Sequence, residues 1–184
     1  MSNKILIASD LHGDAVCTEL LLKRLHEENA ELCVLLGDLL YHGPRNDLPA
    51  GYAPKKVINL LNEERERLLC VRGNCDTEVD QMVLNFPILS DLAVLFIDGR
   101  RWYLSHGHVK NAETPPPMQT GDLLLCGHTH VPTVIPFGKE NLYLNPGSTS
   151  IPKENSPKSY AVYENGVFSW KSLENGETYR TYSL

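Results

Sequence analysis

Short apolar runs alternate with amphipathic segments in the first part of the chain. The runs have the length of buried strands, and the segments between them carry leucine and isoleucine at helical spacing. The expected strands are residues 4–9, 32–36 and 68–71, and the expected helices are residues 14–29 and 53–67. Asp14 suits the N-cap of the first helix, and Pro54 suits the first turn of the second. This strand–helix–strand–helix–strand order predicts a parallel sheet with right-handed crossovers.

After residue 86 the pattern changes to short strands separated by turn residues. The expected strands here are residues 92–97, 100–104, 123–126, 134–137 and 142–144. Asp98-Gly99 is typical of a tight hairpin, and Asn165-Gly166 marks another turn in the tail. We therefore expect the second half to be mostly antiparallel. Because no repeat or linker divides the chain, residues 1–184 are expected to form one domain, with two sheets packed together between helices.

Composition narrows the class of protein. With 42% hydrophobic and 22% charged residues, the chain resembles ordinary globular proteins. It contains neither the roughly 20-residue apolar run that spans a bilayer nor a secretory signal pattern, so the expected location is cytoplasmic, without membrane attachment. A net charge of −6 argues against nucleic acid as the main partner. Five cysteines without a C-x-x-C pair predict neither a disulfide framework nor a thiolate zinc site.

Side chains that can bind a metal follow five of the predicted strands. Residues two apart in an extended segment project to the same side, so His128 and His130 would present two imidazoles together. Sites in open α/β sheets form at the carboxyl ends of strands, so the donors should converge there. The candidate ligands are Asp10, His12, Asp38, Asn74, His106, His128 and His130.

The donor types indicate which metal such a site would take. Carboxylate, amide and imidazole donors without thiolate favour manganese, iron, zinc, nickel or cobalt. Seven donors exceed the four to six positions of one transition ion. They suit two ions that share a bridging carboxylate.

The same motifs resemble the five-block signature of the calcineurin-like metallophosphoesterases. The blocks are Asp10-x-His12, Gly37-Asp38, Gly73-Asn74-x-Asp76, His106-Gly107 and Gly127-His128-x-His130. Further stretches, such as 42–46 and 71–76, are similar to the YfcE-type bacterial phosphodiesterases within that superfamily. The resemblance implies a four-layer α/β/β/α sandwich of two mixed sheets flanked by helices. It also implies that the tail from Ser159 completes the second sheet.

The resemblance further implies a reaction and a role for each candidate. One ion would be bound by Asp10, His12 and His130, and the other by Asn74, His106 and His128. Asp38 would bridge the two ions. The ions would be two divalent metals, with manganese first and zinc, iron or nickel as alternatives. A hydroxide held between them would hydrolyse a small phosphodiester substrate, with Asp38, Asn74, Cys75 and His106 as the catalytic group. A homodimer is compatible with the YfcE-type resemblance.

Three further residues are candidates for contact with substrate. Cys75 stands where much of the superfamily has a histidine thought to protonate the leaving oxygen. A thiol with a pKa near ~8.5 is a poorer acid at neutral pH than an imidazole near ~6.5, and Asp76, if close, would raise the thiol pKa. Cys75 could equally be space-filling. Arg45 could hold a phosphate oxygen or form a surface ion pair, and His108 could face the substrate or support a ligand.

Two other functions fit the same residues. One is a phosphomonoesterase, including a protein phosphatase, that uses the same site. The other is a non-enzymatic interaction scaffold, like the phosphoesterase-like subunit of retromer. Seven filled ligand positions disfavour the scaffold, and the acidic balance disfavours a nuclease.

Overall fold

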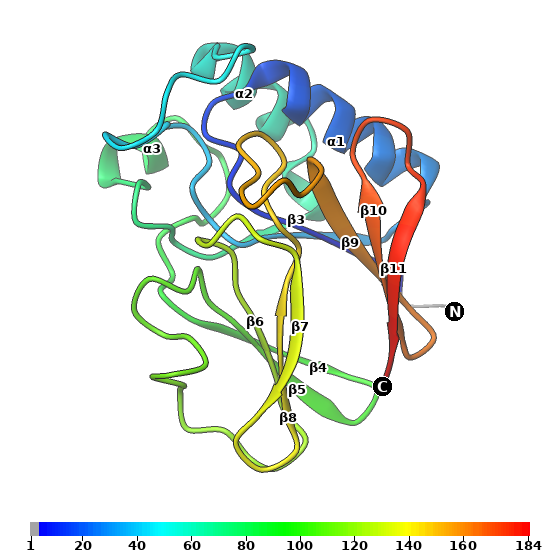
Figure 1. Ribbon diagram of the computed structural model, residues 1–184. Coiled ribbons are helices and arrows are strands. Elements are labelled where there is room, and N and C mark those ends of the chain that lie inside the picture. The colour runs from blue at the N-terminus through cyan, green and yellow to red at the C-terminus, as the bar shows by residue number, and fades with distance from the viewer. Residues whose placement is uncertain (1–3) are drawn as a thin grey trace.

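The computed structural model describes residues 4–184 and contains two mixed sheets packed face to face (Figure 1). The strands of the first sheet are β1 (Ile5–Ala8), β2 (Leu32–Leu35), β3 (Leu68–Cys70), β9 (Ser159–Glu164), β10 (Val167–Ser172) and β11 (Thr178–Ser183). Their order is β11-β10-β9-β1-β2-β3. β1, β2 and β3 run parallel, as the sequence predicted, whereas β9 pairs antiparallel with β1.

The C-terminal strands therefore complete the first sheet, and the expectation that they join the second sheet is wrong. The side chains of β9 explain this position. Tyr160 and Val162 pack on the helix side of the sheet, while Ala161 and Tyr163 face the second sheet. A strand with apolar side chains on both faces belongs inside a sheet that is covered on both sides.

The second sheet holds the remaining strands in the order β4-β5-β6-β8-β7. They are β4 (Ala93–Ile97), β5 (Arg100–Leu104), β6 (Leu123–Leu125), β7 (Thr133–Phe137) and β8 (Asn141–Asn145). The pairs β4–β5 and β7–β8 are antiparallel hairpins, but β5–β6 and β6–β8 are parallel. The second half is mostly antiparallel, as expected, and these two central pairs are the exceptions. Their long connections send each strand back in the same direction.

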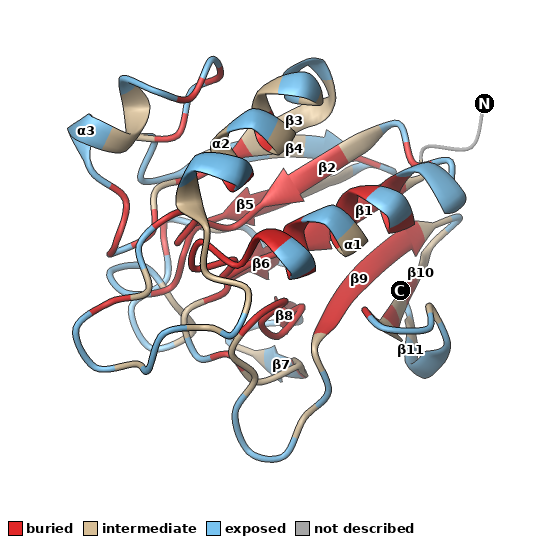
Figure 2. Cartoon of the chain, turned by 90° about the horizontal axis from the view of Figure 1, so that it is seen from above, coloured by how far each residue is buried: buried red, intermediate tan, exposed pale blue. Residues whose placement is uncertain are grey.

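Helices α1 (Ala15–Glu27) and α2 (Pro54–Glu63) cover the outer face of the first sheet (Figure 2). The Asp14 side chain caps α1 as predicted, accepting hydrogen bonds from the backbone N–H groups of Val16 and Cys17 at 3.0 Å each. α2 ends four residues earlier than expected and is followed by one 3-10 turn, Arg65–Arg67. No helix among residues 4–184 combines the length and apolar character needed to cross a bilayer.

Two apolar layers hold the sheets and helices together. Between the sheets, the ring of Trp102 contacts those of Tyr163 and Phe168, with centroids 4.7 and 5.1 Å apart. On the outer face of the second sheet, Met118 of the segment 107–121 packs against a cluster that includes Leu124. Two mixed sheets flanked by helices, the predicted fold class, are confirmed. Segment 107–121 supplies the layer outside the second sheet and contains no helix.

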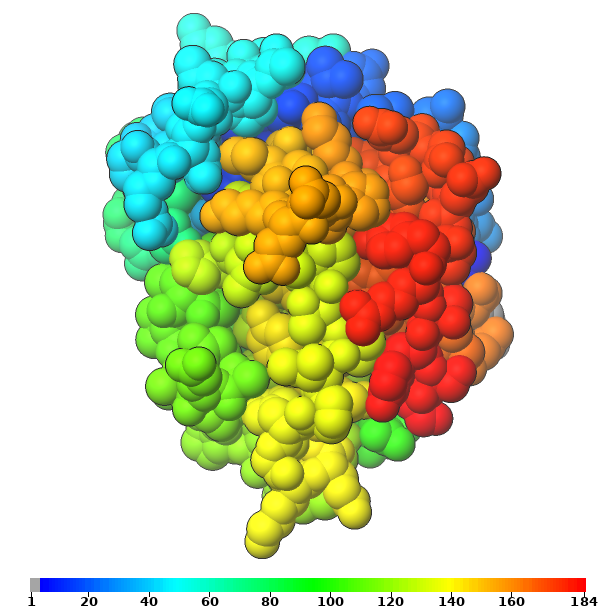
Figure 3. Space-filling view, viewed as in Figure 1, coloured from blue at the N-terminus to red at the C-terminus, as the bar shows by residue number. Residues whose placement is uncertain are grey.

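The loops at one end of the two sheets lie side by side. Figure 3 shows the loop after β8, in orange, next to the loop after β2, in cyan. Residues from both loops line one cavity. The donors that the sequence placed after strands lie at this end of the molecule.

Replacing Asp14 with alanine should lower the free energy of unfolding by about 1–2 kcal/mol, because two N–H groups of α1 lose their acceptor. Asp14→Asn keeps a side-chain oxygen and should retain most of the stability. Urea denaturation of both variants measures the difference, with Asp47→Ala, at an exposed position, as the control. Equal stability of Asp14→Ala and the native chain would contradict this account of the cap.

Candidate metal centre

The seven candidate ligands all lie just beyond strand ends, and both sheets contribute. Asp10 and His12 follow β1, Asp38 follows β2, Asn74 follows β3, His106 follows β5, and His128 and His130 follow β6. Five of them are at most 3% exposed: Asp10, His12, Asp38, His106 and His130. The first sheet thus supplies all the oxygen donors, and the second supplies three of the four remaining imidazole nitrogens.

Asp10, His12 and His130 form one group. The Nε2 atom of His130 lies 3.2 Å from Oδ1 of Asp10 and 3.3 Å from Nε2 of His12. The other ring nitrogens are already used: Nδ1 of His12 lies 2.8 Å from the Tyr41 carbonyl, and Nδ1 of His130 lies 2.6 Å from the Ile151 carbonyl. A carbonyl can only accept, so each Nδ1 carries the hydrogen and donates it. Both Nε2 lone pairs then point inward.

His106 is the centre of a second group. Its Nδ1 donates to the carbonyl of Leu36 at 2.6 Å, which again leaves Nε2 as an acceptor. Nε2 lies 3.0 Å from Oδ1 of Asn74, 3.2 Å from Nδ1 of His128 and 3.4 Å from Oδ2 of Asp38. The same Asp38 oxygen lies 3.8 Å from Nε2 of His12. Asp38 therefore stands between the two groups, where a bridging carboxylate would have to be.

The arrangement fits a cation. Lone pairs that face one another at about 3 Å repel unless a proton or a metal ion lies among them. Burial alone would raise the pKa of Asp10, but the adjacent imidazoles of His12 and His130 lower it well below its usual range. Burial opposes the charge of His106 too, yet hydrogen bonding and charge from Asp38 raise its pKa to about 9. Oδ1 of Asp10 is buried without a hydrogen-bond partner.

Backbone conformation explains how the side chains meet. Five candidate ligands have positive φ, a region that residues other than glycine seldom adopt: Asp10 (57°), His12 (47°), Asp38 (57°), His128 (67°) and His130 (62°). Such conformations cost of order 1–3 kcal/mol and persist where the surrounding structure holds them. The chain turns sharply after β1, β2 and β6, which points consecutive donors into one volume.

Glycines beside the ligands allow the loops to approach. A Cβ at Gly73 would lie 2.1 Å from Oδ1 of Asp38, and a Cβ at Gly37 would lie 2.4 Å from the Gly73 nitrogen. A Cβ at Gly127 would lie 1.9 Å from Oγ of Ser9. These contacts leave no room for a side chain, so the glycines of the sequence blocks have a steric role.

Asp76 fixes the same loops, a role that the sequence reasoning missed. Its carboxylate accepts hydrogen bonds from the backbone N–H groups of Asp38 (2.8 Å), Leu39 (2.9 Å) and Gly73 (2.7 Å). On the other side, hydroxyl groups of Ser148 and Ser150 donate to the Asp10 carbonyl at 2.9 and 2.7 Å. Asp76 belongs to the sequence block Gly73-Asn74-x-Asp76, but its position alone does not reveal this role, because an acid in such a loop often only caps a turn.

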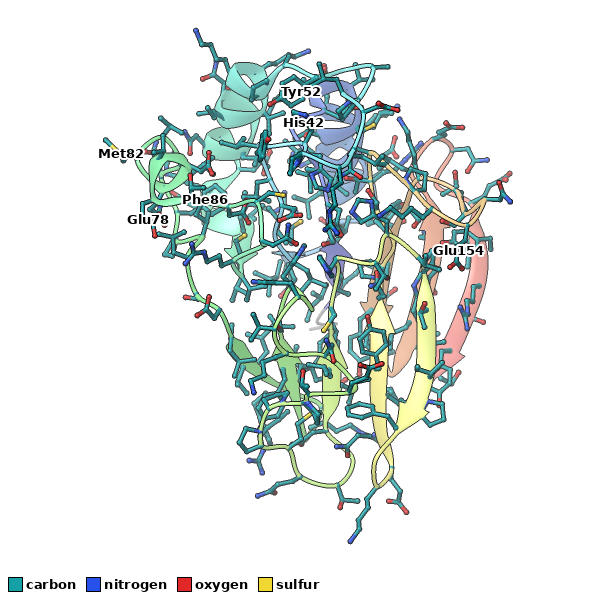
Figure 4. The ribbon with its side chains drawn as sticks, turned by 60° about the vertical axis from the view of Figure 1, so that its left-hand side comes forward. His42, Tyr52, Glu78, Met82, Phe86 and Glu154 are labelled. Atoms are coloured by element: carbon teal, nitrogen blue, oxygen red, sulfur yellow. The ribbon has the colours of Figure 1, made fainter. Side chains whose placement is uncertain are left out.

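The loop after β2 closes one side of the site. The ring of His42 lies edge-on to those of Tyr41 and Tyr52, with centroids 4.8 and 5.4 Å away. Figure 4 shows His42 and Tyr52 near each other, away from Met82 and Glu78 of α3 (Glu78–Gln81). Since the Tyr41 carbonyl accepts from His12, this aromatic contact also steadies a candidate ligand.

A cavity of about 430 Å³ opens onto the centre. Arg45 and Cys75 line it, as expected of substrate contacts, and so does Lys153, which the sequence reasoning did not single out. His108 is not among the lining residues. Its ring lies beside those of His106 and His128, with centroids 5.4 and 6.1 Å away.

Cys75 lies against the donors. Its backbone N–H donates to Oδ1 of Asp38 at 2.8 Å, and its Sγ lies 3.2 Å from Nδ2 of Asn74. Burial, and then the negative charges of Asp38 and Asp76, raise the pKa of the thiol to about 12. The direction expected from Asp76 is confirmed, although burial and Asp38 contribute more.

Comparison with known proteins identifies the family of this centre. The profile of the calcineurin-like phosphoesterase superfamily domain matches residues 4–166. The chain belongs to this superfamily. Phosphodiesterase YfcE of Escherichia coli (strain K12) is 46% identical over 172 residues, which cover 94% of this chain and 93% of that protein.

A solved structure and a second relative support the assignment. A solved structure of the E. coli phosphoesterase YfcE superposes with a TM-score of 0.94 at 43% identity and covers 98% of both chains. The probable metallophosphoesterase YsnB of Bacillus subtilis (strain 168) is 25% identical over 86% of this chain and 82% of its own. Metallophosphoesterases use divalent ions, in agreement with the converging donors described above.

Replacing Gly73 with alanine should weaken the binding of a divalent metal ion by about 10- to 100-fold, the usual cost of disturbing a residue behind a ligand. The added methyl group would displace Asp38, whose Oδ1 and backbone nitrogen would be 2.1 and 2.3 Å away. Isothermal titration calorimetry measures the affinity. Gly99→Ala, with no atom within 4 Å of the new Cβ, is the control, and equal affinity in both variants would refute the steric role.

Proposed function

We propose that this chain is a metal-dependent phosphodiesterase with two divalent cations in the centre around Asp38. The observation that carries the proposal is the convergence of donor atoms for a metal: Nε2 of His106 has Oδ1 of Asn74, Nδ1 of His128 and Oδ2 of Asp38 within 3.4 Å, and Nε2 of His12 faces Nε2 of His130. The 46% identical relative named phosphodiesterase YfcE supports the diester as substrate class.

Asp10, His12 and His130 would hold one ion, and Asn74, His106 and His128 the other, with Asp38 shared. When bound, the ions supply a nucleophile at neutral pH and neutralise charge on the phosphoryl group. The protein's part is to hold the donors. Carbonyls that accept from Nδ1 fix the rings and tautomers of His12, His106 and His130 before any ion arrives.

Two side chains in the cavity would act on the substrate directly. Arg45 would donate hydrogen bonds to a phosphate oxygen. Cys75 would lie beside the leaving oxygen, but a thiol with its pKa raised to about 12 gives up a proton poorly at neutral pH. The enzyme should therefore prefer diesters whose leaving groups are already stable as anions.

The proposal extends to the identity of the metal ion, the oligomeric state and the location in the cell. Manganese is the proposed ion, with zinc, iron or nickel as alternatives. Residues 1–184 are proposed to act as one domain, as a homodimer in the cytoplasm, on a small phosphodiester. These points rest on the donor types and on the resemblance to YfcE-type proteins.

Chelator-treated protein should lose hydrolysis of bis(p-nitrophenyl) phosphate and regain it when manganese is added. Activity on p-nitrophenyl phosphate should be at least about tenfold lower, a difference of about 1.4 kcal/mol in the barrier. Release of p-nitrophenol measures both, with zinc, iron and nickel tested in parallel and Asp38→Asn as the inactive control. A preference for the monoester would favour a phosphomonoesterase, and no turnover with any ion would favour a scaffold.

Replacing Cys75 with histidine should increase hydrolysis of a dialkyl phosphodiester by about 100-fold, the lower end of what a general acid contributes. Hydrolysis of bis(p-nitrophenyl) phosphate, whose leaving group needs little protonation, should change far less. Steady-state kinetics on both esters measures the difference, with Cys75→Ser as the control of similar size. No gain on the alkyl ester would remove the idea that a missing acid limits this enzyme.

A further inference from the structure

Positive charge is concentrated at the mouth of the catalytic cavity. Arg45 and Lys153 both line it, from the loops after β2 and β8, and both are exposed. Asp38 is the only acidic residue among those that line the cavity in residues 4–184, and it lies among the candidate ligands. The chain as a whole carries a net charge of −6, so this local excess of cations runs against the overall charge.

Neither cation is neutralised by the protein. None of the ion pairs among the described residues 4–184 includes Arg45 or Lys153. Glu154, next to Lys153 in the chain, lies at the outer edge of the view in Figure 4 and forms no such pair either. Unpaired cations beside a cavity create a field that favours an anionic ligand.

Lys153 is tied to the metal centre. Its backbone N–H donates to the His130 carbonyl at 3.3 Å, and its own carbonyl accepts from the backbone N–H and hydroxyl of Ser156 at 3.0 and 2.6 Å. The turn that carries Lys153 is thereby fixed to the loop that carries a candidate ligand. Its ammonium group extends from a fixed base at the cavity mouth.

The cavity has room for more than the phosphate that is hydrolysed. About 430 Å³ falls within the range of pockets that hold whole small molecules. The scissile phosphate must lie at the donors around Asp38, which leaves the mouth of the cavity for another part of the substrate. Lysine is a common partner of phosphate, to which it presents a compact charge.

We propose that Lys153 binds a second phosphate group of the substrate, one that is not hydrolysed, while Arg45 in the same cavity contacts the phosphate that is hydrolysed. This inference rests on the proposed phosphodiesterase function and specifies its substrate class. The substrate is a phosphodiester that carries a further phosphate on the part of the molecule that is not the leaving group. Lys153 is then a specificity residue and takes no part in bond cleavage.

The test compares two diesters with the same leaving group. Thymidine 5′-(p-nitrophenyl phosphate) and its 3′-phosphorylated form differ only in the extra phosphate. The manganese-loaded native enzyme should show a higher kcat/KM for the phosphorylated ester. In Lys153→Gln that preference should fall by about three- to tenfold, and in Lys153→Glu further, as expected for loss of an exposed charge contact. Lys139→Gln, an exposed lysine in the β7–β8 turn, removes the same charge and should leave the ratio unchanged.

A binding measurement keeps the inference separate from the activity. Calorimetry in the presence of manganese compares thymidine 3′,5′-bisphosphate with thymidine 5′-monophosphate. Lys153→Gln should lose the advantage of the bisphosphate by a similar factor. Absence of turnover with either ester would overturn the phosphodiesterase function, while the binding ratio would still decide the role of Lys153. A ratio that is equal in Lys153→Gln, Lys139→Gln and the native chain would overturn the inference.

Discussion

Five strands from two sheets end around the carboxylate of Asp38. The loops that follow them approach so closely that there is no room for a side chain between their backbones. Gly37 and Gly73 make this possible, because a side chain on either would overlap the neighbouring loop. Asp76 then holds three N–H groups from both loops on one carboxylate. The donor cluster depends on this packing of main chain against main chain.

The packing also explains why the centre lies between the sheets. The oxygen donors and His12 follow strands of the first sheet, and the other three histidines follow strands of the second. The apolar layer around Trp102 sets the distance between the sheets. A shift of a fraction of an ångström in the spacing of the sheets would change the distance between Asp38 and His106, since close-packed interiors deform little. Packing of the core between the sheets therefore also determines the geometry of the candidate ligands.

Much of this arrangement could be predicted from the sequence, because the determinants are local. The parallel β1–β2–β3 unit, the Asp14 cap and the Asp98-Gly99 hairpin follow from periodicity and turn chemistry. Sheet membership of the tail does not, because a strand with two apolar faces fits either sheet until its partner is known. The short helix α3 was missed although Thr77 and Asp80 form a capping box, since four residues give too little periodicity to detect.

The candidate ligands could be recognised because each follows an apolar run, whereas their supports could not. Asp76 and Lys153 contact residues distant in the chain, Asp38 and His130, and the sequence does not reveal these contacts. His108 shows the limit of spacing as a guide: its separation from His106 resembles that of His128 and His130, yet it does not line the cavity, and its ring lies beside that of His106. Spacing along a strand gives the side of the sheet but not the final direction after the strand ends.

The positive φ angles of Asp10, His12, Asp38, His128 and His130 have a consequence for how the protein can change. At each position the main chain alone would favour glycine, the residue that adopts this conformation without steric cost. Stability of the main chain and the capacity to bind ions therefore favour different residues at these five positions. Selection for heat tolerance alone would tend to erode the donor set, and only a continuing need for its chemistry would keep it.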